Sequence, residues 1–180
     1  MAQRRTRGAI KLGIRTIAPK SNIGAFPGLS NQFVVICSMS LNGPVIILED
    51  DPDDEDLLIS IFAELGIRNK VLWFTRAPEA FAYLQTTLDT PFIILSDINL
   101  PGMSGIEFKR AIDEDPKLRK KSIPFVFYST SIEQGAVNEV YTKMTVQGFF
   151  QKPSTYAETK ERISLIFAYW QKCRHPNSGG

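Results

Sequence analysis

Acidic, hydroxyl and basic side chains come directly after the ends of four short apolar runs in this sequence. They are Glu49, Asp50, Asp97, Ser129 and Lys152. If the runs are parallel strands, all of these ends lie on one edge of one sheet. Ligand sites of open α/β sheets lie on that edge. The pattern therefore predicts a single site assembled from distant parts of the chain.

The chemistry expected of such a cluster follows from its charges. Carboxylates that are packed together repel each other and raise one another's pKa values. A divalent cation among them removes this repulsion, and clustered carboxylate oxygens with water suit Mg²⁺. A lysine and a hydroxyl group facing the same cluster suit a phosphoryl group. We therefore expect Mg²⁺ as the cofactor and a phosphoryl group that meets Asp97.

The elements that would position this cluster are predicted by an alternation along residues 44–172. Five apolar runs, which begin near residues 45, 71, 92, 125 and 148, alternate with five segments of helical periodicity. Continuous apolar runs are typical of parallel strands that are buried on both faces. The alternation predicts an α/β fold with a five-stranded parallel sheet, doubly wound, and five helices that cover both faces.

Helix boundaries are indicated by capping residues. Asp51 before Pro52 marks a helix start, and Gly66 ends that helix. The acidic residues 53–56 are interpreted as helix-start charges that favour the positive end of the helix dipole, and not all of them as ligands. Asp115-Pro116 breaks the third helix, and residues 117–122 are expected to form a charged connection.

The charge is distributed unevenly along the chain. Net charge is +2, but residues 1–43 hold six Lys and Arg and no acidic residue. The remainder has 15 of the 21 basic residues against all 19 acidic ones, which makes it net −4. DNA binding by the folded part is therefore not expected. The leader, 1–43, is interpreted as disordered or non-native, and we expect the functional polypeptide to begin near Met39.

The sequence also excludes several function classes. Cys37 and Cys173 form no metal-ligand spacing and predict no disulfide framework, which fits a cytoplasmic location. His175 is the single histidine and lies near the C-terminus, so a Ser-His-Asp or Cys-His mechanism is not expected. No apolar run approaches the length of a membrane span. Residues 173–180 are predicted to be a flexible tail, with no second domain after residue 172.

The order of these motifs resembles the receiver domain of two-component response regulators, and the resemblance covers residues 44–172. Five features carry it: Glu49-Asp50, Asp97, Pro101-Gly102, Ser129 and Lys152-Pro153. Each is weak alone, but five in register across five strands are specific. The long connection over residues 113–124 and the acidic run after residue 48 also resemble stand-alone, chemotaxis-regulator-like or phytochrome-partner-like members. The resemblance implies a flavodoxin-like sheet with strand order 2-1-3-4-5.

The resemblance also implies a role for each site residue. Asp97 would be the phosphoacceptor and would attack the phosphorus of a kinase phosphohistidine. The Mg²⁺ ligands would be Asp97, Asp50, the backbone carbonyl of Asn99 and, through water, Glu49. Lys152 would neutralise phosphoryl oxygens in an in-line transfer that needs little further chemistry. Ser129 and Phe149 would form the switch. Such a protein is a phosphoacceptor with at most slow self-catalysed turnover, and not an enzyme.

The implied partners are proteins. A sensor histidine kinase, hybrid kinase or phosphotransfer protein would supply the phosphoryl group. The phosphorylated form would bind a downstream protein or a second copy of the chain. The binding face would consist of the fourth predicted helix, near residues 136–144, the fifth strand and the fifth helix, with Tyr141, Met144 and Tyr156 at its rim.

Two residues depart from the family pattern. Phe149 stands where many members have tyrosine, and phenylalanine has no hydroxyl group to anchor a buried rotamer. Thr130 stands where members usually have Ala or Gly, and its bulk could restrict access to the phosphoryl group. In that family the peptide bond between Lys152 and Pro153 can be cis.

Two other functions compete with this interpretation. Haloacid-dehalogenase-like phosphatases also combine an Asp nucleophile, Mg²⁺, a hydroxyl residue and a lysine. They need a second acid two residues after the nucleophile, and that residue here is Asn99, which cannot act as a general acid or base. A degenerate receiver that signals without phosphate is the other alternative, against which the complete set of acids and lysine argues.

Overall fold

The computed structural model describes residues 41–173 of the chain. Most of the predicted leader, the expected start near Met39 and the tail from residue 174 onward lie outside the described residues. So do Cys37 and His175. The described part corresponds to the predicted domain over residues 44–172.

The centre of the fold is a parallel sheet of five short strands. They are β1 (Val45–Leu48), β2 (Val71–Phe74), β3 (Ile93–Ser96), β4 (Phe125–Ser129) and β5 (Gly148–Gln151). Their order is β2-β1-β3-β4-β5, and every neighbouring pair is parallel. The expected flavodoxin-like order is therefore confirmed. β1, β3 and β4 are buried along their whole lengths, because each has a helix layer on both faces.

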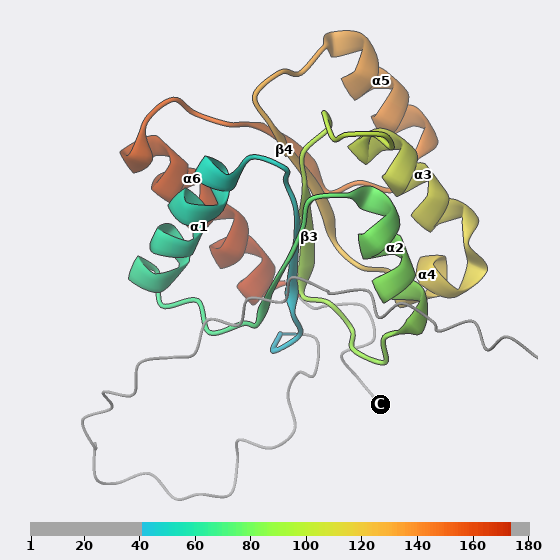
Figure 1. The fold of residues 1–180 in the computed structure, drawn as a ribbon, viewed down its shortest axis with the longest axis horizontal. Coiled ribbons are helices and arrows are strands. Elements are labelled where there is room, and N and C mark those ends of the chain that lie inside the picture. The colour runs from blue at the N-terminus through green and yellow to red at the C-terminus, as the bar shows by residue number, and fades with distance from the viewer. Residues whose placement is uncertain (1–40, 174–180) are drawn as a thin grey trace, which may run out of the picture.

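Helices cover both faces of the sheet, as Figure 1 shows. One face is covered by α1 (Pro52–Glu64) and α6 (Tyr156–Lys172), and the other by α2 (Ala77–Thr86), α3 (Gly105–Glu114) and α5 (Gln134–Lys143). The core consists of two apolar clusters, one on each side of the sheet. Alternate residues of each strand point into each cluster, so that Phe127 faces α5 while Val126 and Tyr128 face α6.

The predicted number of helices was wrong, because residues 41–173 contain six. The connection after the third helix holds α4 (Pro116–Lys121). Asp115 caps it by accepting hydrogen bonds from the N–H groups of Lys117 and Leu118, and Pro116 occupies its first turn. Four of the six residues of α4 are basic and only Leu118 is buried, so the sequence of this segment shows no apolar periodicity. The fourth and fifth predicted helices are thus α5 and α6.

The helices that follow β1 and β3 are capped by side chains. The side chain of Asp51 accepts a hydrogen bond from the N–H of Asp53 at the start of α1. Ser104 and Glu107 form a reciprocal capping box at the start of α3. Each such cap stabilises its helix by about 1 kcal/mol. The chain therefore leaves β1 and β3 in defined directions.

Gly105, the first residue of α3, brings this helix into contact with the backbone that follows β3. Its N–H donates to the carbonyl of Ile98 at 2.9 Å, and a β-carbon on it would collide with the carbonyl oxygen of Asp97. Only glycine permits this approach. α3 therefore begins directly against the residue that carries the predicted nucleophile.

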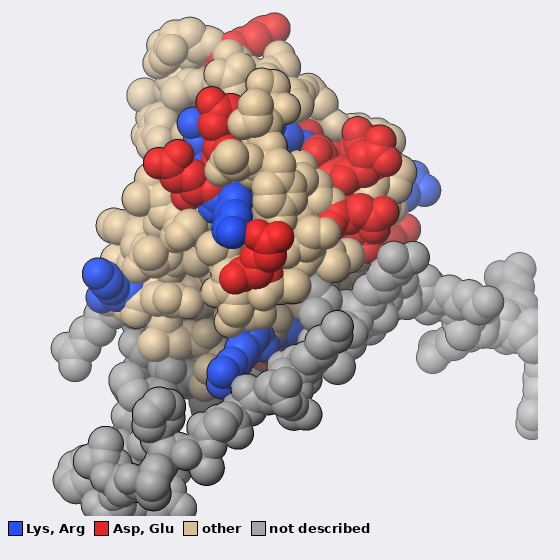
Figure 2. Space-filling model, turned by 90° about the vertical axis from the view of Figure 1, so that its left-hand side faces the viewer, with Lys and Arg blue, Asp and Glu red and all other residues tan. Residues whose placement is uncertain are grey.

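The face covered by α1 and α6 carries charges of both signs, with acidic groups gathered on the right of Figure 2. The first turn of α1 contributes Asp53, Asp54 and Glu55. This face has no continuous basic surface of the kind that binds a phosphate backbone. No helix within residues 41–173 is long and apolar enough to cross a membrane.

Replacing Gly105 with Ala should destabilise the protein by about 1–3 kcal/mol, because the added methyl group overpacks the contact with Asp97. Gly135, near the start of α5, has open space around it. Gly135→Ala should therefore be neutral or stabilising by up to about 1 kcal/mol. Urea unfolding monitored by circular dichroism measures both. Equal stability of the two variants would contradict this account of α3.

Candidate functional site

Four of the predicted side chains meet at the carboxyl edge of the sheet. The hydroxyl group of Ser129, at the end of β4, donates to Asp97 Oδ1 at 2.5 Å. Lys152 Nζ, after β5, lies 3.0 Å from Asp97 Oδ2 and also forms an ion pair with Glu49, after β1. Asp97 is therefore held between a hydroxyl group and an ammonium group.

The two remaining predicted metal ligands are less closely tied to this cluster. Asn99 is exposed, and its backbone N–H donates to Asp97 Oδ1 at 3.0 Å. Asp50 is exposed beside Glu49. Within residues 41–173, no three side chains of the types Asp, Glu, His or Cys are already gathered tightly enough to hold a metal ion. In this arrangement the lysine sits among the carboxylates.

Asp54 is a member of the cluster that the sequence reading missed. Its Oδ2 lies 2.6 Å from Lys152 Nζ, so three carboxylates surround one ammonium group. The sequence pattern indicates Asp54 only as one of the helix-start charges. The available signal was its position: side chains in a helix lean toward its N-terminus, and α1 begins within four residues of β1. An acid in that first turn is therefore aimed back at the strand ends.

The cluster is largely withdrawn from water. Glu49 is 3% exposed and Asp97 is 7% exposed. Burial raises the pKa of Glu49 to about 7, although Lys152 opposes this. Burial alone would lower the pKa of Lys152, but its hydrogen bonds to Asp54 and Glu49 outweigh that effect and hold the pKa above its usual range. The lysine therefore stays charged in the presence of an excess of acidic groups.

Two neighbours fix the backbone of the site. The indole Nε1–H of Trp73 donates to the carbonyl oxygen of Glu49 at 2.9 Å, and the hydroxyl group of Ser96 donates to the carbonyl of Asp97 at 2.8 Å. Trp73 and Trp170 are both half-buried and pack at the margin of the core. Trp73 is thereby a spectroscopic probe built into the site.

Phe149 lies on β5 directly opposite Phe127 of β4, and the two rings stack with centroids 4.6 Å apart. Ser129 follows Phe127 by two residues, so its side chain points to the same face of the sheet. Phe149 also contacts Tyr141 of α5, whose ring centroid is 5.7 Å away. Tyr141 is 54% exposed. A row of rings thus joins the face that holds Ser129 to the surface of α5.

Of the two remaining family-specific expectations, restricted access at Thr130 stays a prediction, and the structure decides only the geometry of the Lys152–Pro153 peptide. Thr130 is exposed next to Ser129, and its carbonyl accepts a hydrogen bond from the side chain of Gln151 at 3.3 Å. The Lys152–Pro153 peptide is trans, as are all peptide bonds in the described part of the chain. The cis geometry that the resemblance allowed is therefore absent.

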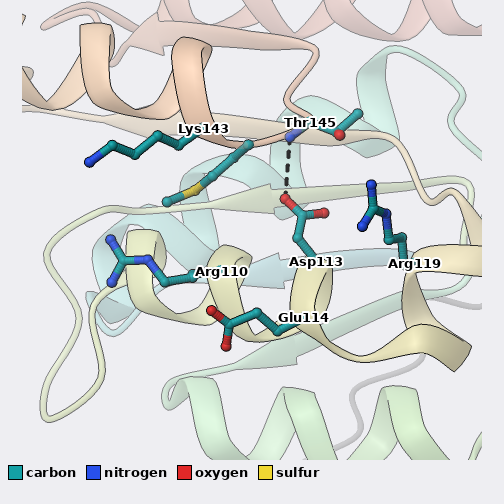
Figure 3. Close-up of a pocket in the computed structure, with 7 residues that line it drawn as sticks. Arg110, Asp113, Glu114, Arg119, Lys143 and Thr145 are labelled. Atoms are coloured by element: carbon teal, nitrogen blue, oxygen red, sulfur yellow. Dashed lines mark hydrogen bonds between the residues drawn. The ribbon is translucent and has the colours of Figure 1, made fainter.

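A cavity of about 350 Å³ lies elsewhere, between α3, α4 and the segment before β5 (Figure 3). Its lining is Arg110, Asp113, Glu114, Arg119, Lys143, Met144 and Thr145. Asp113 is already engaged, since it accepts from the N–H of Thr145 at 3.2 Å and pairs with Lys109 at 2.6 Å. This cavity contains no residue of the carboxylate cluster, although Met144, which is expected at the rim of the partner-binding face, lines it.

Known proteins with similar sequences and folds carry the same kind of domain. The chemotaxis protein CheY of Pseudomonas aeruginosa is 26% identical over 124 residues, which are 68% of this chain and 94% of CheY. The phosphorylated cyanobacterial phytochrome response regulator RcpA is 25% identical, with a TM-score of 0.66 over 76% of this chain and 99% of RcpA.

A third relative supports the fold alone. It is the receiver domain of the sensor histidine kinase PA1611 from Pseudomonas aeruginosa, whose crystal structure has a magnesium ion coordinated in the active-site cleft. It is 20% identical, with a TM-score of 0.55 over 72% of this chain and 97% of that domain.

The family itself is established by a match over most of the described part. The model of the response regulator receiver domain matches residues 45–164, which span the sheet, the carboxylate cluster and Lys152. The fold, the strand order and this match agree, and the chain belongs to the response regulator receiver domain family.

Proposed function

We propose that this receiver domain accepts a phosphoryl group from a histidine kinase on Asp97, with Mg²⁺, and signals by binding another protein. The observation that carries the proposal is the way Asp97 is held. Ser129 and the N–H of Asn99 donate to its Oδ1, and Lys152 contacts its Oδ2. An acyl phosphate formed here has a hydroxyl group and an ammonium group beside it from the start.

The transfer itself needs few groups. A carboxylate oxygen of Asp97 attacks phosphorus, the bond from phosphorus to the kinase histidine breaks, and the imidazole leaves with the bonding electrons. Lys152 remains charged at neutral pH and stabilises negative charge on the phosphoryl oxygens. Burial of Asp97 strengthens that interaction because water screens it poorly.

The residues present fit Mg²⁺ by their chemistry. The donors would be carboxylate oxygens of Asp50 and Asp97, a backbone carbonyl at Asn99 and, through water, Glu49. Oxygen donors are those that Mg²⁺ prefers. Three carboxylates, those of Glu49, Asp54 and Asp97, contact one lysine, so the metal-free site has an excess of negative charge. Bound Mg²⁺ would supply the missing positive charge and polarise the phosphoryl group. The magnesium-bound PA1611 receiver supports this assignment by similarity of fold.

The output would run from Ser129 through Phe149 to the surface of α5, β5 and α6. Movement of the Ser129 hydroxyl toward an acyl phosphate changes the space behind it, and Phe149 stacks on the neighbouring strand residue. Tyr141, Met144 and Tyr156 are the rim residues that we assign to a partner, which is a downstream protein or a second copy of the chain. Without a tyrosine hydroxyl, packing alone biases this switch, with a coupling of about 1–3 kcal/mol.

Acetyl phosphate with Mg²⁺ should place at most one phosphoryl group on each chain and change the fluorescence of Trp73. Asp97→Asn should remain unlabelled, whereas Asp53→Asn, an exposed acid on α1, should behave as wild type. Intact mass spectrometry and fluorescence check this, and EDTA should abolish both signals. Equal labelling of Asp97→Asn would refute the assignment of the phosphoacceptor. Sustained release of phosphate would favour the phosphatase, and no labelling of wild type would favour a degenerate receiver.

Phe149→Ala should leave phosphorylation of Asp97 intact while reducing phosphate-dependent association about tenfold, the lower part of the usual coupling range. Phe150→Ala is the matched control, because it removes a half-buried ring from the same strand but from the opposite face. Sizing chromatography and binding to the cognate kinase or target, with and without beryllofluoride, measure the effect. The same phosphate response in both variants as in wild type would exclude Phe149 as the coupling residue.

A further inference from the structure

The ammonium group of Lys152 uses its full donor capacity in this structure. An ammonium group has three N–H donors. Lys152 Nζ has three carboxylate partners on three different segments: Glu49 after β1, Asp97 after β3 and Asp54 on α1. Its side chain is 7% exposed. An N–H of Lys152 is therefore available to a phosphoryl oxygen only if the hydrogen bond to one of the three carboxylates breaks.

Two of these partners have another task in the proposed function. Asp97 receives the phosphoryl group, and Glu49 belongs to the metal-binding set. Asp54 has neither role, and among the three partners it is the most exposed, at 27% for its side chain against 5% and 8% for the others. It is thus the one carboxylate that stays available to Lys152 throughout the reaction.

We propose that Asp54 is a positioning residue that holds Lys152 at the site while Glu49 and Asp97 are engaged elsewhere. This rests on the proposed function of Asp97. One N–H of Lys152 stays on Asp54, and the two released by Glu49 and Asp97 become available for phosphoryl oxygens. Asp54 acts through the lysine and does not touch the reacting atoms.

The element that carries Asp54 suits this task. α1 is capped by Asp51, has Pro52 in its first turn and buries Leu58, Ile61 and Phe62 against the sheet. A carboxylate in its first turn is therefore fixed relative to the strand ends, as a positioning group must be. Lys152 itself is followed by Pro153 and donates its backbone N–H to the carbonyl of Ser129 at 2.9 Å. Both ends of this ion pair rest on rigid backbone.

Loss of Asp54 has a defined consequence. Lys152 would then have only Glu49 and Asp97 as partners, so it would compete for the carboxylates that the metal and the phosphoryl group need. Both the loss of a negative charge and this competition weaken Mg²⁺ binding. At saturating Mg²⁺ the lysine would still lack its anchor, and transfer should remain slow.

The test compares Asp54→Ala and Asp54→Asn with Asp53→Ala in the full chain. Asp53 is an exposed acid in the same turn of α1, so its removal controls for the lost charge at the helix N-terminus. With acetyl phosphate at saturating Mg²⁺, the phosphorylation rate should fall about tenfold in Asp54→Ala, as expected for a lost hydrogen bond between charged groups. Asp54→Asn, which keeps an acceptor, should be intermediate, and Asp53→Ala should match wild type.

A second measurement needs neither metal nor phosphate. In EDTA, acetylation of Lys152 by acetic anhydride, quantified by mass spectrometry relative to exposed Lys143, should be several-fold faster in Asp54→Ala than in wild type or Asp53→Ala. Equal Lys152 acetylation in all variants, or equal phosphorylation rates in Asp54→Ala and Asp53→Ala, would overturn the proposal. If wild type and Asp97→Asn were alike toward acetyl phosphate, the proposed function would fail, while the acetylation result would still decide whether Asp54 holds the lysine.

Discussion

One ammonium group shared by several carboxylates is the interaction on which the rest of this structure depends. Buried charges are tolerated only when they are paired and hydrogen-bonded. Glu49 and Asp97 are buried, and Lys152 is the cation that makes their burial possible. The strands on which they lie must therefore end at the same height, and the parallel register of β1, β3, β4 and β5 provides this.

The same strands form the apolar core and position the polar side chains at the carboxyl edge of the sheet. β1, β3 and β4 are short apolar runs buried between helices, and each run gives way to polar residues at its carboxyl end. Gly105 and the capped starts of α1 and α3 then fix how the chain turns away from the edge. The turns at the site are thus fixed by the core beneath it, while Phe149 and Tyr141, which are only partly covered, would provide the adjustable packing of the proposed switch.

The sequence was sufficient to predict those features that depend on burial and chain order. The five strands and the convergence of Glu49, Asp97, Ser129 and Lys152 follow from apolar runs that stop at polar residues, whereas the strand order follows only from the resemblance to the receiver domain. α4 was missed because a six-residue helix with one buried side chain has no periodicity to detect. The roles of Asp54 and Trp73 were missed because each depends on a contact across elements, from α1 to Lys152 and from β2 to the carbonyl of Glu49. Helix propensity and hydrophobicity carry no information on such contacts.

The position of β5 at one edge of the sheet has a consequence for self-association. An edge strand presents unpaired backbone groups that can template the addition of further chains, and nature limits this with short strands, charged residues and proline. β5 has four residues, and Lys152-Pro153 follows at once. Pro153 has no N–H to donate to an added strand. The side chain of Lys152 points inward, toward its three carboxylate partners. The dipeptide that supplies the cation of the site thereby also protects the protein against edge-to-edge aggregation.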